Sequence, residues 1–478
     1  MVNLPHIGGQ NHATEIQQTA LQITIAGDVH IMVPNSVDLM TPYILTEQQD
    51  WFEDEIKFIR KLIQPGSNVL DIGANYGCYA MTMAKLIGEE GHLWAFEPAN
   101  STAGFLSESI SINRFNNVTL IKAALSNRNG TAELSLASNS ELNAITSETG
   151  SGQTESVPLK RLDDCIEHYQ WSDIEFVKLD AEGEEVHILE GGEKFFSNFS
   201  PLVMFELKHC DQVNEGLIQK FISFGYETYI LVPGLQILAP FNATDIADEF
   251  LLNLFCCKQD TATALADRGL LITEVKDSSE QEQSSDWHTH LSQFHYAKAL
   301  MPTWQQVIEQ QPLPGWEGYE QALNLYAGAH DNSSPEIRLF RLQQALITLI
   351  SVLNEHASVP KLLTLIRIAK ELGKRNVAVQ TLHQIIQHFI QESTFQISEP
   401  FLAVSPEAEV SNPEGRLAEW CLAWVLRERE MLQAYSSYFT GQDSLPAIDH
   451  FLTLGFEDME MARRSNLIRM RFNLPANV

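Results

Sequence analysis

The chain has 478 residues, 44% of them hydrophobic, so more than one domain with a well-packed core is expected. Only 31 Lys and Arg stand against 62 Asp and Glu, and the formal net charge is −31. Such an excess of acid disfavours DNA or RNA as a partner, because contacts to phosphates need clustered basic side chains. The 6 cysteines include no C-x-x-C pair, which is typical of reduced thiols. No signal-peptide pattern and no membrane-length apolar run are present, so a cytoplasmic protein without a membrane span is expected.

Residues 1–260 alternate short apolar runs with helical patterns, which is typical of an α/β domain, preceded by an extension over residues 1–50. Strands are predicted at 68–72, 92–97, 118–123, 174–180 and 202–207. Helices are predicted at 51–63, 77–87, 101–114, 184–197 and 214–224. Two more strands at 226–232 and 250–257 have no helix between them, so they are expected to close the sheet, the last one antiparallel.

The second half of the chain has a different character. Residues 261–287 are predicted to be a polar linker because 277–286 carry almost no apolar side chain. Residues 288–478 show only helical spacing, so an all-α domain is predicted. Within it, Leu362 to Phe389 resemble one tetratricopeptide-like helix pair with Ala369 and Gly373 at the crossing, but no second copy follows at a fixed period.

A glycine loop after the first predicted α/β strand indicates a cofactor site. It runs from Asp71 through Gly73, Ala74 and Asn75 to Gly77. A dinucleotide loop would have glycine where Asn75 stands, because the pyrophosphate needs that clearance. S-adenosylmethionine has no phosphate, so the loop favours this cofactor, with Gly73 and Ala74 under its methionyl part.

Two later strand ends are expected to complete the cofactor site. Glu97, followed by Pro98, ends the next predicted strand and is placed to hold the ribose hydroxyls. The adenine is expected near Ala124, Leu125 and Ser126. A glycine turn needed only for packing is the alternative explanation.

Several blocks in order carry a resemblance to a known family. They are Asp71-Ile-Gly-Ala-Asn-Tyr-Gly77, Ala95-Phe-Glu-Pro98, Asn113, Ala124-Leu-Ser126, Leu162-Asp163-Asp164, Lys178-Leu-Asp-Ala-Glu-Gly183 with Glu185, and Phe205-Glu206. In these blocks the first 258 residues resemble FkbM-type S-adenosylmethionine-dependent methyltransferases. The resemblance implies a class I (Rossmann-like) methyltransferase sheet beside the C-terminal all-α domain. It also implies O-methylation of a sugar, a glycan or another natural-product hydroxyl.

Methyl transfer to a hydroxyl needs a general base or a cation that acidifies the oxygen. The candidates lie at predicted strand ends, where open α/β sheets bind ligands: Asp180, Glu182, Glu206 and His209. Asp180 is also expected to contact the cofactor, although it could instead form a structural pair with Lys178 two residues earlier. Glu182 could merely begin a helix, and His209 could merely be hydrogen-bonded. A Mg²⁺ ion held by Asp180, Glu206 and His209 is a further hypothesis that no tight ligand spacing supports.

Two segments are candidates for the acceptor pocket. Trp51 and Phe52 lie between acidic residues within 46–55, a combination that suits carbohydrate, but both rings could equally belong to a core. Residues 140–143 could form a lid over the site or an ordinary surface loop.

Three functions from different classes follow. The first is an O-methyltransferase acting on a glycan, a glycosylated metabolite or a non-sugar natural product. The second, a methyltransferase of nucleic acid or protein nitrogen, expects an Asn/Asp-Pro-Pro-aromatic block, which residues 179–182 do not form. The third is a non-catalytic scaffold, which usually loses the glycine loop or the ribose acid. The helical domain is expected to bind a protein partner or to mediate self-association.

Overall fold

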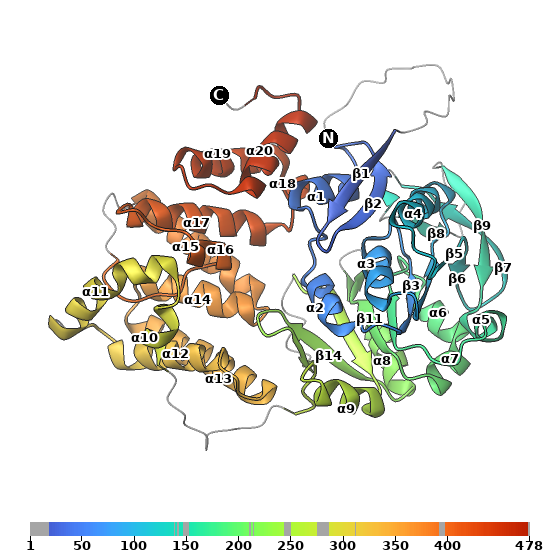
Figure 1. The fold of residues 1–478 in the computed structure, drawn as a ribbon, viewed down its shortest axis with the longest axis horizontal. Coiled ribbons are helices and arrows are strands. Elements are labelled where there is room, and N and C mark those ends of the chain that lie inside the picture. The colour runs from blue at the N-terminus through green and yellow to red at the C-terminus, as the bar shows by residue number, and fades with distance from the viewer. Residues whose placement is uncertain are drawn as a thin grey trace, which may run out of the picture.

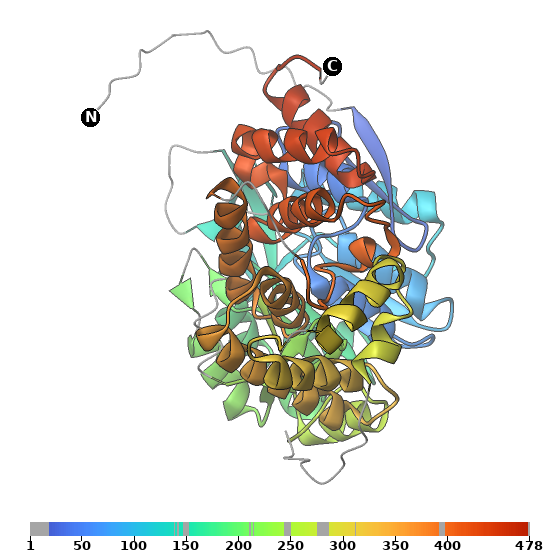
Figure 2. The ribbon, with the colours of Figure 1, turned by 90° about the vertical axis from the view of Figure 1, so that its left-hand side faces the viewer.

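The computed structural model describes residues 19–137, 139–140, 143–146, 153–209, 212–213, 215–242, 250–274, 286–310, 312–391 and 397–476. An α/β domain and a helical domain lie side by side (Figure 1). Seen from the left-hand side of that view, the yellow-to-red helices lie in front of the blue and green α/β domain (Figure 2). The described part of the chain contains no helix that is both long and apolar enough to cross a bilayer.

An eight-stranded sheet forms the centre of the α/β domain, in the order β15-β14-β16-β11-β10-β3-β4-β5. Its strands are β3 (Asn68–Ile72), β4 (His92–Phe96), β5 (Val118–Ile121), β10 (Phe176–Leu179), β11 (Leu202–Glu206), β14 (Glu227–Val232), β15 (Ile237–Pro240) and β16 (Asn253–Cys257). β11, β10, β3, β4 and β5 are parallel, and β16 is antiparallel to both β11 and β14. The predicted sheet and its antiparallel last strand are confirmed, and β15 adds an edge strand that was not predicted.

Helices cover both faces of this sheet and bury two separate apolar cores. One face carries α2 (Asp54–Leu62), α3 (Cys78–Ile87) and α4 (Asn100–Asn113), and the other carries α5 (Leu162–Tyr169), α6 (Glu185–Gly191), α7 (Glu193–Asn198) and α8 (Glu215–Ser223). The helix predicted over 184–197 is in fact two, α6 and α7, which meet at Gly192. A Cβ on Gly192 would come within 2.9 Å of the end of the Leu162 side chain, so the two residues pack closely.

Several elements of the α/β domain were not predicted. They are the hairpin β1 (Ala20–Ile25) and β2 (Val29–Pro34), α1 (Met40–Gln48), the short pair β12 (Lys208–His209) and β13 (Gln212–Val213), and a small sheet of β6 (Ala124–Leu125), β9 (Thr154–Lys160), β7 (Gly130–Ser135) and β8 (Ala144–Thr146). α9 (Gln259–Asp267) overlaps the stretch 261–287 that was predicted to be a linker. These residues are folded instead, because Ala262 and Leu265 of α9 and Leu271 after it are buried in the α/β core. The polar residues 275–285 lie outside the described residues.

From residue 286 onward every described element is helical, as predicted. The helices are α10 (Trp287–Leu291), α11 (His295–Gln310), α12 (Trp316–Ala329), α13 (Pro335–Glu355), α14 (Val359–Glu371), α15 (Arg375–Gln391), α16 (Pro406–Val410), α17 (Leu417–Gln433), α18 (Ser437–Thr440), η3 (Gly441–Ser444), α19 (Leu445–Thr453) and α20 (Met459–Arg471). α14 and α15 are the predicted helix pair. Gly373 does not lie at their crossing but in the turn between them, where its φ of 71° favours glycine.

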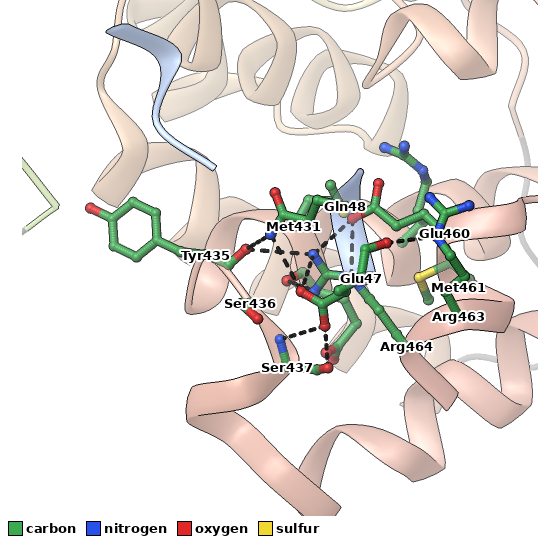
Figure 3. A network of polar contacts seen from close by, with 12 residues as sticks. Glu47, Gln48, Met431, Tyr435, Ser436, Ser437, Glu460, Met461, Arg463 and Arg464 are labelled. Atoms are coloured by element: carbon green, nitrogen blue, oxygen red, sulfur yellow. Dashed lines mark hydrogen bonds and ion pairs between the residues drawn. The ribbon is translucent and has the colours of Figure 1, made fainter. Parts of the chain in front are cut away.

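A buried ionic contact joins the two domains (Figure 3). Glu47 in α1 and Arg464 in α20 are both fully buried, and their side chains approach to 3.6 Å. The backbone N–H of Ser437 donates to the Glu47 carboxylate at 3.0 Å. Beside them, Gln48 donates to the carbonyl of Tyr435 at 2.7 Å. Residues almost 400 positions apart in sequence, such as Glu47 and Ser437, therefore share one buried polar network.

A second contact joins the β14–β15 turn to the end of α14. The N–H of Gly234 donates to the carbonyl of Glu371 at 2.9 Å, and a Cβ on Gly234 would lie 2.3 Å from the Glu371 Cβ. Val232, Leu235 and Ile237 beside this turn belong to the same apolar core as the helical domain. These polar and apolar contacts fix the arrangement of the two domains.

Candidate active site

The predicted glycine loop connects β3 to α3 and passes close to the end of β10. Gly73, Asn75 and Gly77 have φ angles of 78°, 50° and 95°, values that glycine and asparagine tolerate best. A Cβ on Gly73 would lie 1.7 Å from the backbone oxygen of Asp180, so no other residue fits without moving the main chain. The loop thus brings its backbone next to the strand that carries the catalytic candidates.

Glu97 lies at the end of β4, directly beside this loop. Its carboxylate accepts hydrogen bonds from the N–H groups of Asn75 at 3.0 Å and Ala99 at 2.9 Å. Burial raises the pKa of Glu97 to about 7, although the two N–H donors oppose that rise. Glu97 and Pro98 both line the cavity described below, where the sequence predicts the ribose.

A buried lysine lies beneath the loop. Lys178 Nζ is 2.9 Å from Asp180 Oδ2 and 3.8 Å from Asp71 Oδ1, and it donates to the carbonyl of Gly73 at 3.2 Å. Burial opposes the charge of Lys178, but Asp180 and Asp71 raise its pKa above the ordinary value. Burial raises the pKa of Asp71 to about 6. Asp71 is fully buried and does not line the cavity, so its place is under the loop, where it supports Lys178.

A solvent-open cavity of about 980 Å³ lies over the loop and the strand ends. The predicted site residues that line it are Gly73, Ala74, Asn75, Gly77, Glu97, Pro98, Ala124, Leu125, Asp180 and Glu182. Ser126, expected near the adenine, is not a lining residue, and its hydroxyl donates to Glu184 at 2.9 Å. The structure therefore gathers most of the predicted cofactor residues around one space, while Asp71 and Ser126 support its walls.

The charges of this cavity suit a cation. Its lining includes a single basic side chain, Lys178, and five carboxyl groups: Glu53, Glu97, Asp180, Glu182 and Glu184. S-adenosylmethionine carries positive charge on its sulfonium and on its ammonium group, whereas a dinucleotide carries phosphates. Electrostatics therefore favour the first ligand and oppose the second.

Asp180 and Glu182 follow β10 in a tight loop. The Asp180 side chain is 38% exposed and Glu182 has a φ of 50°. The carboxylate of Glu185 accepts from the N–H of Ala181 at 2.9 Å and from that of Gly183 at 3.1 Å, which fixes the loop. Asp180 is thus both the partner of Lys178 and part of the wall of the cavity.

The other two catalytic candidates are placed differently. Glu206 ends β11 and does not line the cavity, and burial together with the charges of Asp180 and Glu182 raises its pKa to about 9. His209 lies in β12, but its side chain is outside the described residues. Within the described ranges, no group of three or more His, Cys, Asp or Glu side chains could hold a metal ion.

The sequence predicted Glu53 only as one of the acids in the candidate acceptor segment 46–55, and it did not predict Tyr79 as a member of the site. The hydroxyl of Tyr79 donates to Glu53 Oε2 at 2.5 Å. Burial raises the pKa of Glu53, and the nearby charge of Asp180 adds to the rise, whereas Tyr79 lowers it. Their positions in the sequence could have indicated the site, because Tyr79 comes two residues after Gly77 and Glu53 directly precedes α2.

The two segments that the sequence proposes for the acceptor pocket, 46–55 and 140–143, also contribute to this cavity. Trp51 is half-buried and lines the cavity while packing against the core, and Phe52 lies against it with ring centroids 4.8 Å apart. The hydroxyl of Ser140 donates to Asn75 Oδ1 at 3.0 Å, and Ser140 and Asn143 both line the cavity. Glu141 and Leu142 lie outside the described residues.

A second and larger hollow separates the two domains. This interdomain cleft has a volume of about 2070 Å³ and is lined by residues 50–57, by the β14–β15 turn and by helices of the helical domain. Trp51 and Glu53 line both the cofactor cavity and the cleft. The two hollows therefore adjoin at this pair of side chains.

Three solved structures that resemble this chain each cover less than half of it. A putative rRNA methylase from Clostridium thermocellum is 12% identical over 43% of this chain and 92% of its own, with a TM-score of 0.26. The methyltransferase FkbM from Methylobacillus flagellatus KT is 14% identical over 42% of this chain and 50% of its own, with a TM-score of 0.29. A SAM-dependent methyltransferase from Aquifex aeolicus is 12% identical over 45% of this chain and 93% of its own, with a TM-score of 0.28. No curated protein matches the chain.

The family comparison agrees with the geometry of the site. Residues 71–228 match the methyltransferase FkbM domain, a range that begins at the buried aspartate under the glycine loop and ends in β14. It contains the glycine loop, Glu97 and the loop around Asp180. The chain therefore carries a methyltransferase domain of the FkbM family and is an S-adenosylmethionine-dependent methyltransferase.

Proposed function

We propose that this protein methylates a hydroxyl group of a sugar, a glycan or a glycosylated metabolite. One observation carries the proposal: the cofactor cavity adjoins a large cleft at an aromatic ring and a carboxyl group, Trp51 and Glu53. Rings pack against the apolar C–H faces of sugars, and carboxyl groups hydrogen-bond sugar hydroxyls. Both kinds of group thus stand where an acceptor would meet the donor.

The donor half of the site would be built as follows. Glu97, Ala124 and Leu125 line the cavity. Glu97 would accept hydrogen bonds from the ribose hydroxyls, and Ala124 and Leu125 would contact the adenine. The carboxyl groups of the cavity wall, Glu182 among them, balance the positive charges of the cofactor. When bound there, S-adenosylmethionine supplies a methyl group made electrophilic by its positive sulfur.

Asp180 is our candidate for the general base. Lys178 holds Asp180 Oδ2 at 2.9 Å and so orients the carboxylate, which leaves Oδ1 to accept the proton of the acceptor hydroxyl. Removal of that proton by Asp180 would make the hydroxyl oxygen nucleophilic toward the methyl group that the bound cofactor would supply, with S-adenosylhomocysteine as the other product. Positioning supplies much of the rate in such an in-line displacement, and general-base catalysis adds about 10²–10⁴-fold.

Other acceptors fit the site less well. A non-sugar natural product with a hydroxyl would use the same base, and the ring of Trp51 would serve it equally. Nucleic acid is opposed by the net charge of −31 and by the carboxyl groups of the cavity. A scaffold without catalysis would not need the tight approach of Gly73 to Asp180.

The test is a transfer assay with labelled cofactor and a panel of neutral saccharides, nucleotide sugars and polyphenols. Label in the saccharides at an oxygen supports the proposal, whereas label only in polyphenols or in nucleic acid overturns it. Asp180→Asn should lower kcat by at least about 100-fold with cofactor affinity changed far less. Asp173→Asn is the matched control, because Asp173 is exposed before the opposite end of the same strand. Activity that survives a chelator would exclude a role for Mg²⁺.

We also infer a cytoplasmic location. Cys78, Cys165, Cys256, Cys257 and Cys421 are all buried thiols, and none of these described cysteines forms a disulfide. Such thiols suit a reducing compartment. Fractionation of the native host would test the location.

A further inference from the structure

We infer that the interdomain cleft binds an extended, neutral oligosaccharide, so that the helical domain forms half of the acceptor site. This inference rests on the proposed function and deepens it. It makes the helical domain part of the enzyme's substrate specificity. The sequence had assigned that domain only a partner-binding or self-association role.

A row of rings leads from the cofactor cavity across the cleft. Trp51 lines the cavity, and its ring centroid is 4.8 Å from that of Phe52. Phe52 is in turn 5.1 Å from Tyr435 of the helical domain. The guanidinium of Arg375 lies 3.6 Å from the centre of the Tyr435 ring and 4.8 Å from that of Phe250. All five side chains line the cleft. The four rings and the flat face of the Arg375 guanidinium form a row of surfaces, a path for successive sugar faces.

The orientation of Tyr435 supports this path. Its backbone carbonyl accepts the hydrogen bond from Gln48 at the contact between the domains. Its ring extends away from the ionic pair of Glu47 and Arg464, as Figure 3 shows. The contact that joins the domains thus also holds the ring in the cleft.

Most lining cations of the cleft are already matched by acids, which leaves little positive charge for an anionic acceptor such as a nucleotide sugar. Its lining carries eight carboxyl residues (Asp50, Glu53, Asp54, Glu55, Glu371, Glu407, Glu428, Glu460) against five cations (Lys57, Arg367, Lys370, Arg375, Arg427). Most of these cations are matched by acids: Arg367 by Glu371 at 2.5 Å and Lys370 by Glu428 at 2.5 Å. Arg427 likewise reaches Glu428 at 2.7 Å, and Lys57 reaches Asp54 at 3.0 Å.

Arg375 stacks its guanidinium on two rings of the cleft. Its Nε donates to the carbonyl of Leu432 at 2.7 Å while its flat face stacks on the rings. The stacked guanidinium therefore continues the row of rings. A diphosphate would need several basic donors turned toward it, whereas a neutral glycan needs the rings and the many hydrogen-bonding acids.

The cleft is larger than the cofactor cavity. Its volume, which includes open solvent, is about 2070 Å³, roughly twice the 980 Å³ of that cavity. A longer hollow of this kind suits an acceptor of more than one sugar. The cleft is also preformed, because the Glu47–Arg464 pair and the Gly234–Glu371 contact fix its two walls. In a preformed site, ordering of the protein around a long ligand costs little free energy.

The experiment compares glucose, mannose and N-acetylglucosamine oligomers, from mono- to hexasaccharide, with UDP-glucose as the anionic probe. Binding by calorimetry and methyl transfer are both measured on the full-length protein. We expect affinity to rise with oligomer length and UDP-glucose to bind more weakly than the best neutral oligomer. Phe52→Ala and Tyr435→Ala should each raise KM for the longest good acceptor by about tenfold or more, with the KM for the cofactor unchanged.

Phe439→Ala is the matched control, because Phe439 is an exposed ring of the helical domain that does not line the cleft. Phe439→Ala should leave KM for every acceptor within about twofold, since isolated surface rings contribute little. Melting curves of all three variants identify any loss of folding, and Phe52→Leu and Tyr435→Phe keep the cleft filled if an alanine variant is unstable.

Two kinds of failure can be told apart. Methylation of monosaccharides alone, or no effect of Phe52 and Tyr435 variants on oligomer binding, overturns the cleft assignment and leaves the proposed function standing. Tighter binding of UDP-glucose than of any neutral oligomer also overturns it. Cofactor binding without transfer to any saccharide overturns the proposed function, and the cleft assignment with it.

Discussion

The cofactor cavity and the interdomain cleft adjoin at Trp51 and Glu53, yet they come from very different stretches of chain. Most of the cavity is formed by the ends of neighbouring parallel strands, between Ile72 and Glu184. The cleft joins residues 48–57 to side chains as distant as Glu460. A short motif can specify the first, because strand ends meet automatically at one edge of a parallel sheet. The second exists only because two domains dock.

The strongest test of this contrast is Gly73→Ala in the cofactor loop. The new Cβ would overlap the backbone oxygen of Asp180, which cannot move without distorting β10. We expect cofactor binding to fall below detection at millimolar concentrations, measured by calorimetry, together with a lower melting temperature. Gly104→Ala is the matched control, since nothing lies within 4 Å of its Cβ in α4, and it should stabilise the helix by up to about 1 kcal/mol. Wild-type affinity in Gly73→Ala would show that the close approach is not required.

The substitution Arg464→Met tests the contact between the two domains independently of the cofactor loop. This change leaves the Glu47 carboxylate buried without its cation, a loss that typically costs about 3–5 kcal/mol. Urea unfolding should show the loss, and acceptor turnover should fall more than cofactor affinity. Arg416→Met is the control, because Arg416 and Glu419 are 42% and 52% exposed and such pairs contribute about 0–1 kcal/mol. Equal losses in the two variants would contradict a specific role for the buried pair.

The pH dependence of cofactor binding tests whether ionised Glu97 binds the ribose. Its pKa of about 7 lies above the ordinary 4.5, so the free native protein holds this proton over a range in which the unfolded chain has lost it. Because ribose hydroxyls donate best to the ionised form, affinity should rise by up to about tenfold per pH unit as pH increases toward 7, then level off.

The same proton makes native stability fall as pH rises from about 4.5 to 7, since the unfolded state binds fewer protons there. Glu97→Gln should weaken binding and flatten both profiles, whereas Glu108→Gln on the exposed face of α4 should leave them unchanged. A pH slope of binding that persists in Glu97→Gln would assign it to another group.

The smallest expected effect comes from Tyr79→Phe, next to the boundary of the two hollows. The hydroxyl of Tyr79 donates to Glu53 and lowers the pKa of that carboxyl, so its loss should raise that pKa further. We expect a kcat decrease corresponding to about 1 kcal/mol and a shift of the acidic limb of the rate profile to higher pH. A pH–rate profile identical to that of the wild type would indicate that Glu53 does not take part in turnover.

The sequence by itself determined the parallel strands, the glycine loop and the acid after β4, because hydrophobic runs and glycine spacing are local properties. It also identified the family, and Asp180, predicted at a strand end, lines the cavity. The sequence missed features that depend on long-range packing. Residues of α9 were predicted to be linker, but Ala262 and Leu265 are buried, and the helix predicted over 184–197 is divided at Gly192.

The surroundings of Trp51 and Phe52 could be known only from the tertiary structure. Trp51 and Phe52 could have been core or surface, and only the position of Tyr435, fixed by the buried Glu47–Arg464 pair, places them along a cleft. Likewise, Asp71 resembles a cofactor ligand in sequence, but its full burial under the loop makes it a support for Lys178. The physical reason is the same in each case: a local pattern specifies which backbone turns and strands form, whereas side-chain neighbours from distant segments are specified by packing.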